Sequence, residues 1–181
     1  MKNTLIALAL VLPGSLAAQS CPEVEDKSSQ MATLFTLLNR AQSDLQASPV
    51  EAALWDLWTD APDAAAQALL DEGRDRLAAR DFAGARTALD ALVAYCPAYA
   101  EGYNQRAFVA YLSGDFAAAL VDLDRALALE PLHVAALSGR ALTLLGLGRD
   151  DEGQRTLRRA LKLNPWLDER ALLKPIRGDT F

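Results

Sequence analysis

Apolar residues recur along the chain in a regular pattern, with a period of about 34 residues. Three segments rich in alanine and leucine end at Pro97, Pro131 and Pro165, and these prolines are evenly spaced. The last two segments, RALALEP and RALKLNP, are nearly identical, and the first, ALVAYCP, is a looser version. Self-similarity at a fixed period of this length is the sequence signature of a repeat array. The pattern predicts three units, at residues 66–99, 100–133 and 134–167.

Each unit is expected to contain two helices joined by a tight turn. Alanine and leucine dominate while aromatic residues are few, which favours helices packed on helices over a sheet. Gly114 and Gly148 can adopt the left-handed conformation that ends a helix. Each proline then stops one helix and opens the next unit.

This pattern resembles the tetratricopeptide repeat, which has large and small apolar residues on a first helix, a Gly-Asp-aromatic turn, and alanines and a proline along a second helix. The resemblance covers about 100 residues at constant spacing. It implies an all-α fold: a right-handed α-solenoid of stacked antiparallel helix pairs with a C-terminal capping helix. In the middle unit the matching residues are Tyr103, Ala107, Gly114, Asp115, Phe116, Ala119, Leu123, Ala126 and Pro131.

Several residues depart from the family pattern. Three charged residues stand where the family packs apolar or aromatic side chains. After the third turn, an aspartate replaces the usual aromatic residue and a glycine replaces an alanine. Because an unpaired buried charge is costly, we expect Arg106 to pair with an acid such as Asp122. The departures are Glu72, Arg76, Arg106, Asp150 and Gly153.

The two ends of the array are predicted to carry further helices. Residues 21–65 should form an N-terminal helix pair, a degenerate fourth repeat, because Phe35, Leu38 and Trp55 fall at the family's packing positions. The sequence Ser48-Pro-Val-Glu is a capping box with proline at the first helical position, so a helix should begin there. After the third unit, residues 168–181 should form a capping helix and tail, with the last helix opening at Asn164-Pro165 and running to about Leu173.

Residues 1–20 have the pattern of a secretory signal peptide. A lysine near the start precedes an apolar run, a Pro-Gly break and a series of small residues. We expect export, with the periplasm as the destination and no membrane span once the signal is removed. Secretion, or retention of this segment as a membrane anchor, are the alternatives.

The mature chain would keep two cysteines, Cys21 and Cys96. In an exported protein, two cysteines favour a disulfide over a metal site, because zinc needs four convergent ligands. One buried and one free thiol is the alternative, and lipidation of Cys21 is another.

Most kinds of chemistry are disfavoured by what the sequence contains. The net charge of −6 argues against nucleic-acid binding, because phosphate contacts need clustered basic residues. The single histidine, His133, is expected in a turn or at a helix start, and we find no motif for a metal, a cofactor, a phosphate loop or an activated nucleophile. We therefore expect a protein that is not an enzyme and has no cofactor.

The first helices of stacked repeats line a concave groove, which is the expected binding surface. The basic clamp that some family members use for a C-terminal carboxylate is absent, because Leu70, Ala135 and Gly139 occupy its positions. A mixed polar and apolar groove fits an extended peptide or a partner helix. The groove residues carried over from the family are Arg74, Glu101, Asn104, Gln105, Phe108, Tyr111, Ser138 and Leu142.

The sequence thus favours a non-catalytic adaptor or scaffold whose groove binds a protein partner, and it does not identify that partner. A structural or oligomerisation role in an envelope complex, through apolar surfaces around Trp55, Trp58 or Trp166, is the second hypothesis, and the oligomeric state stays open. A small-ligand carrier or an enzyme is a weaker third. Residues 21–148 hold 9 basic and 18 acidic side chains, which are either a solvated surface or a preference for a cationic partner.

Overall fold

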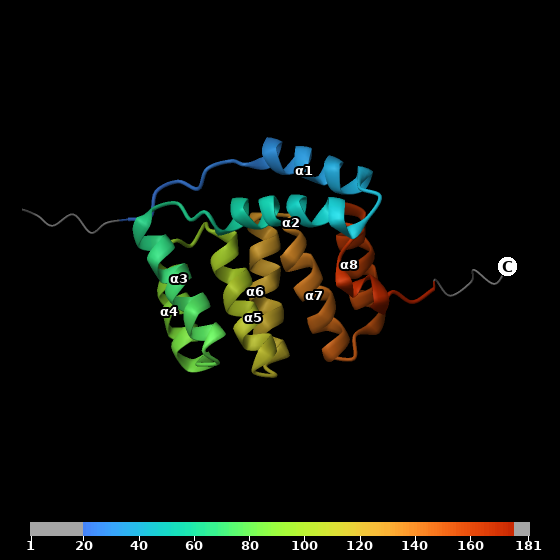
Figure 1. Ribbon diagram of the computed structural model, residues 1–181. Helices are drawn as coiled ribbons and strands as arrows, with labels where there is room; N and C mark the ends of the chain where they lie inside the picture. The colour runs from blue at the N-terminus through green and yellow to red at the C-terminus, as the bar shows by residue number, and fades with distance from the viewer. Residues whose placement is uncertain (1–19, 176–181) are drawn as a thin grey trace, which may run out of the picture.

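The three expected units appear as three antiparallel helix pairs packed side by side (Figure 1). The fold is described here from a computed structural model, for residues 20–175, and the proposed signal segment lies almost wholly outside these residues. The described residues are all-α, and the stacked pairs form a solenoid. The pairs are α3 (Ala64–Ala78) with α4 (Phe82–Tyr95), α5 (Ala100–Leu112) with α6 (Phe116–Leu129), and α7 (Val134–Gly146) with α8 (Asp150–Leu163).

The turn inside each unit uses the same backbone conformation. Gly114 and Gly148 have φ of +78° and +71°, which confirms their left-handed conformation. Arg80, at the equivalent position of the first unit, has φ of 61°, a conformation that costs a non-glycine residue about 1 kcal/mol. Asp81 and Asp115 follow directly and cap the second helices, each carboxylate accepting a hydrogen bond from a first-turn amide. The turn therefore ends one helix and begins the next almost at once.

Two departures from the family pattern have clear packing reasons. A Cβ atom at Gly153 would lie 2.9 Å from the Leu145 side chain, so any other residue would force this leucine to move. The expected pairing of Arg106 is confirmed: its guanidinium donates two hydrogen bonds to the Asp122 carboxylate, at 2.6 and 2.7 Å, and a third to Asp90. The hydrogen bonds with Asp122 raise the pKa of Arg106. The ion pair thus joins two helices of one unit to the unit before.

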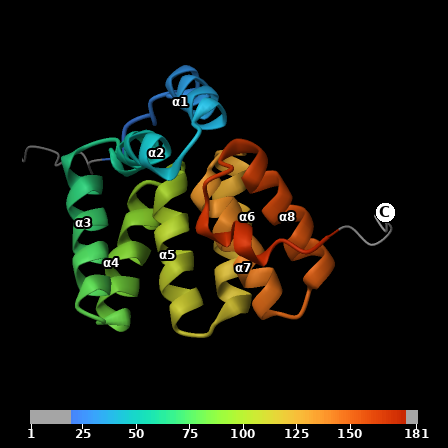
Figure 2. The ribbon, with the colours of Figure 1, turned by 45° about the vertical axis from the view of Figure 1, so that its right-hand side comes forward.

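The N-terminal helices α1 (Ser28–Arg40) and α2 (Asp44–Thr59) do not continue the stack (Figures 1 and 2). Helix α2 crosses the ends of α5, α6 and α7, and α1 lies on its outer side. Phe35 and Leu38 are buried as expected for packing residues, in a cluster formed with α2 and with residues of the third unit at the end of the array. This placement differs from the expected fourth unit.

The start of α2 was also predicted wrongly. The helix begins at Asp44, and Pro49 lies inside it. Pro49 is the sixth residue of α2, so it cannot donate to the carbonyl of Leu45, and its ring crowds that carbonyl. The turn before it forms nonetheless, because the amides of Gln46 and Ala47 donate to the carbonyl of Ser43.

The N-terminal helix pair is anchored to one end of the array, which we call the loop edge: the connections Cys96–Tyr99, Glu130–His133 and Asn164–Leu167. Three residues of the loop edge hold the pair, and they occupy the same position in successive units. Cys96 forms a disulfide with Cys21, Glu130 accepts a hydrogen bond from Trp58 Nε1 at 3.0 Å, and Asn164 donates one to Glu51 at 2.7 Å. Equivalent positions of the three units therefore contact one N-terminal segment, the helix pair and the residues that lead into it.

The segment after α8 is shorter and less regular than expected. A turn at residues 165–166 is followed by a 3-10 helix, η1 (Asp168–Leu172), in place of an α-helix through Leu173. Trp166 in the turn donates its indole N–H to the carbonyl of Leu38, which fixes the C-terminal segment to α1.

Candidate binding groove

The concave face is lined by α3, α5 and α7, the first helices of the three units. Six of the eight groove residues expected from the sequence line a single pocket of about 270 Å³. They come from α5 and α7, so the pocket opens between the second and third units. The six are Asn104, Gln105, Phe108, Tyr111, Ser138 and Leu142.

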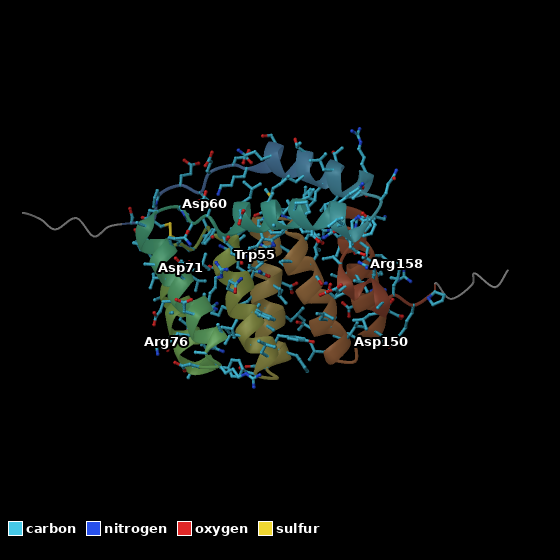
Figure 3. The ribbon with its side chains drawn as sticks, viewed as in Figure 1. Trp55, Asp60, Asp71, Arg76, Asp150 and Arg158 are labelled. Carbon is cyan, nitrogen blue, oxygen red and sulfur yellow. A yellow bond between two sulfur atoms is a disulfide. The ribbon has the colours of Figure 1, made fainter. Side chains whose placement is uncertain are left out.

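The pocket is completed by residues from outside the first helices. Trp55 of α2 forms one wall, Leu167 and Glu169 of the C-terminal segment form another, and Leu123 of α6 contributes from the second helix of its unit. The sequence placed Trp55 at a packing position or on an apolar surface for assembly, not in the groove, and the repeat pattern contained no signal for Leu167 or Glu169. The crossing of α2 over the array is what brings Trp55 to the groove (Figure 3).

Most of the pocket surface is apolar, and one of its aromatic side chains is exposed to solvent. Phe108 is 48 % exposed, and Tyr111 packs against Phe116 with ring centroids 5.3 Å apart. Exposed aromatic side chains beside a concave surface are typical of protein-binding sites.

Two hydroxyl groups at this apolar pocket lack hydrogen-bond partners. Ser138 is 5 % exposed and Thr143 is fully buried, and neither side-chain oxygen makes a hydrogen bond. Buried polar groups are nearly always hydrogen-bonded, so two such exceptions at one pocket need an explanation.

Arg74 and Glu101, the other two expected groove residues, do not line this pocket. The guanidinium of Arg74 lies over the Trp55 ring, 5.7 Å from its centroid, and so supports the wall from outside. Glu101 is only 1 % exposed, so a partner cannot contact its carboxylate directly.

Glu101 instead has a structural role at the base of the groove. Its carboxylate accepts hydrogen bonds from Asn104, Gln105 and His133, at 3.0, 2.6 and 2.8 Å. His133 caps α7, because its Nδ1 accepts from the amide of Ala136, and we therefore assign its proton to Nε2. A carboxylate with three donors can be buried without a large penalty, and it fixes the Asn104 and Gln105 side chains at the groove.

A second cavity, of about 570 Å³, lies between the N-terminal helix pair and the loop edge. The charged residues of its lining are six acidic side chains and one basic side chain, Lys27, which is paired with Asp60 at 2.7 Å. Tyr99 reaches across the joint and donates to the carbonyl of Trp58 at 2.6 Å, and burial raises the pKa of Tyr99. The cavity belongs to the joint that holds the helix pair.

Residues 20–175 contain no group of three His, Cys, Asp or Glu side chains placed to hold a metal ion. Within the same range, no helix has the length and apolar character that a membrane crossing requires.

Comparisons with known proteins agree with this architecture. The family model described as tetratricopeptide repeat matches residues 110–171. A TPR repeat-containing protein of Rhizobium etli is 26 % identical over 175 residues, which cover 91 % of this chain and 86 % of the relative.

Solved structures share the fold. The first TPR of Spaghetti (RPAP3), bound to an HSP90 peptide, has a TM-score of 0.58 at 22 % identity and covers 59 % of this chain and 85 % of its own. The TPR2B domain of yeast Sti1, in a pHsp70 complex, has a TM-score of 0.55 at 23 % identity, with coverages of 56 % and 81 %. Together with the constant repeat period and the stacked helix pairs, the family model and the Rhizobium relative support a tetratricopeptide repeat protein, and the solved structures show that the fold is shared.

Proposed function

We propose that the protein is a non-catalytic adaptor or scaffold whose concave groove binds a segment of another protein. The observation that carries this proposal is the apolar pocket between α5 and α7, with the half-exposed Phe108 beside it. The Spaghetti and Sti1 domains were solved with an HSP90 peptide and with pHsp70, so proteins of this fold do bind polypeptide segments.

The chemistry of this groove differs from a carboxylate clamp. Leu70 is fully buried, and Ala135 and Gly139 line the pocket without offering a charged or hydrogen-bonding side chain. We therefore do not propose recognition of a C-terminal carboxylate for this chain. The ligand is a segment that places an apolar side chain in the pocket.

The experiment is an affinity capture from the native compartment with the mature protein as bait, comparing wild type, Asn104→Ala/Phe108→Ala and Val121→Ala. Val121 is a matched control, because it is an exposed apolar residue on α6, away from the pocket. Proteins that bind in the groove should be retained by wild type and Val121→Ala and lost from the double variant. Equal retention by all three baits would show that the groove assignment is wrong.

We also propose export to the periplasm. The signal-like residues 1–20 and the disulfide between Cys21 and Cys96 support this location, because disulfides persist in oxidising compartments. The intact mass of the protein purified from cell fractions tests it. A mature chain that begins between residues 18 and 21 and carries the disulfide is expected in the periplasmic fraction. A chain with its first residues intact, or with a lipid on Cys21, would contradict the proposal.

The oligomerisation hypothesis loses support from the positions of the three tryptophans. Trp58 is buried in the joint with the loop edge, Trp55 forms the pocket wall, and Trp166 donates to Leu38 within the chain. Light scattering after size exclusion separates the two functions, because a stable oligomer that buries the groove would favour the structural role.

A further inference from the structure

The ion pairs at the two internal junctions of the array have the same polarity. Between the first and second units, Arg106 of α5 donates to Asp90 of α4 at 2.8 Å. Between the second and third units, the equivalent Arg140 of α7 donates to Asp124 of α6 at 2.7 Å. At both junctions the arginine comes from the first helix of the following unit, and the aspartate comes from the second helix of the preceding unit.

The two ends of the array carry the opposite charges at these positions. One repeat period before Arg106, on α3, stands Glu72, and one period after Asp124, on α8, stands Arg158. Figure 3 shows Arg158 at one end of the array and Asp71, the neighbour of Glu72, at the other. The two ends are therefore complementary to each other, whereas each would meet a like charge at an internal junction.

The surroundings of both residues strengthen this complementarity. Glu72 pairs at 2.6 Å with Arg76, which also pairs with Asp81 at 2.9 Å, so this group keeps a net negative charge. Residues 153–167, on α8 and the turn after it, contain four basic side chains and no acidic one. The Arg158 guanidinium donates to two backbone carbonyls and makes no ion pair within residues 20–175, so it is held in place while its charge stays uncompensated.

The two ends also keep the shapes that pack against each other inside the array. At the first internal junction, Gly102 of α5 lies against Val93 of α4, and a Cβ added to this glycine would be 3.3 Å from the valine side chain. The equivalent positions at the ends are Ala68 on α3, which is exposed, and Leu161 on α8, which is partly exposed. The C-terminal segment beside α8 adds two exposed leucines, at 172 and 173. A small residue at one end can thus approach an apolar surface at the other.

We propose that copies of this protein associate end to end, with Glu72 of one copy paired with Arg158 of the next. The partner at each end is a second copy, because the chain itself carries both halves of the reversed ion pair. The contact joins two different faces, so it continues as an open chain or closes as a ring. It uses neither α5 nor α7, so the groove stays open and the proposal does not depend on what the groove binds. Salt screens exposed charges, so the association should weaken as the ionic strength rises.

The test measures self-association of the mature, oxidised protein by sedimentation equilibrium at low salt, at protein concentrations up to about 1 mM. Glu72→Arg and Arg158→Glu each place like charges at the contact, and the double variant exchanges the two charges. Arg155→Glu is the matched control, because it makes the same charge change on α8 at a position that faces away from neighbouring units. Its equivalent on α6, Val121, is 69 % exposed.

Wild type should form oligomers that grow with concentration and dissociate in salt. Each single variant should weaken the association at least about tenfold, because like charges at a contact are unfavourable. The double variant, and an equimolar mixture of the two single variants, should both associate within about threefold of wild type, because each brings opposite charges together again. This restoration also shows that the variants are folded. Arg155→Glu should associate as wild type does.

Any of four results would overturn the proposal. The first is a wild-type protein that stays monomeric up to about 1 mM. The second is single variants that associate as strongly as wild type. The third is a double variant or a mixture that stays as weak as the single variants. The fourth is an Arg155→Glu variant that weakens association as much as Arg158→Glu, because the effect would then come from net charge and not from the end contact.

Discussion

Trp58 is the side chain on which the docking of the N-terminal helix pair should depend most strongly. It is only 5 % exposed, its ring stacks on His133 with centroids 4.5 Å apart and planes 13° apart, and its Nε1 donates to Glu130. All of these contacts cross from α2 to the loop edge. Replacing Trp58 with alanine should therefore release α1 and α2 while leaving the three repeat units folded.

The expected loss of docking free energy in Trp58→Ala follows from the burial of the side chain and from the contacts that are lost. Truncation of a buried tryptophan to alanine typically costs about 3–5 kcal/mol, and the Glu130 carboxylate loses its donor as well. We therefore expect the substitution to weaken the docking of the helix pair by about 4 kcal/mol. Since about 1.4 kcal/mol corresponds to a factor of ten, the ratio of undocked to docked molecules should rise by about 10³.

Hydrogen exchange measured by mass spectrometry reports this ratio segment by segment. In Trp58→Ala, peptides from α1 and α2 should exchange up to about 10³-fold faster, whereas peptides from α4 and α6 should keep their wild-type rates. Trp58→Phe is the matched control, because it keeps a ring on His133 and loses only the bond to Glu130. Its effect should be nearer tenfold.

Two results would refute this reasoning. Unchanged exchange in α1 and α2 would mean that the disulfide and the other loop-edge contacts hold the pair without Trp58. A uniform increase over all helices would mean that the pair and the array unfold as one unit.

Three further predictions concern the covalent tie, the inter-unit ion pair and one helix cap. Replacing Cys21 with serine removes the disulfide to Cys96, which closes a loop with a sequence separation of 75, and should lower the free energy of unfolding in urea by about 4 kcal/mol. Equal free energies of unfolding for the oxidised protein and the variant would contradict a stabilising role for the disulfide. Arg106→Leu should cost about 2 kcal/mol, less than a fully buried pair because the Arg106 side chain is 21 % exposed, and unchanged stability would show that the pair with Asp122 is not structural. Hydrogen bonds from a first-turn amide of α3 and from a tyrosine hydroxyl lower the pKa of Asp63, so its stabilising contribution should be complete above about pH 5 and lost as the pH falls below about 4. In urea unfolding across this range, the stability difference between wild type and Asp63→Asn should shrink as the pH falls, and a constant difference would contradict the cap.

The repeats could be predicted because their packing is written into each unit separately. Gly114 and Gly148 fix the turns, the prolines close the units, and Arg106 needs an acid that the same pattern places at Asp122. Each of these features depends on residues within about one unit of each other. Six groove residues on α5 and α7 could be placed for the same reason, since the family's first helix faces the groove in every unit.

The pocket walls could not be predicted in this way, because they depend on contacts between distant segments. Trp55 reaches the groove only because α2 crosses the array, and Glu169 only because η1 lies beside the pocket that α7 lines. The roles of Glu101 and Thr143 were equally hidden. The repeat pattern places Glu101 in the groove, but three hydrogen-bond donors keep its carboxylate buried. The same pattern makes Thr143 an ordinary helix residue, but its hydroxyl has no hydrogen-bond partner.

The chemistry of the loop edge also explains why the N-terminal helix pair docks at one place on a repeating surface. A surface that repeats with every unit offers the same shape three times, so a helix pair that recognised shape alone could shift by one unit. The three equivalent positions differ instead: Cys96 takes a disulfide, Glu130 accepts from an indole, and Asn164 donates to a carboxylate. A shift by one unit would place Cys21 against Glu130 and the Trp58 ring against Leu167 in place of His133, so the disulfide and the ring stack would both be lost. Unlike residues at equivalent positions therefore specify the register, and the register determines that α2 presents Trp55 to the groove between the second and third units.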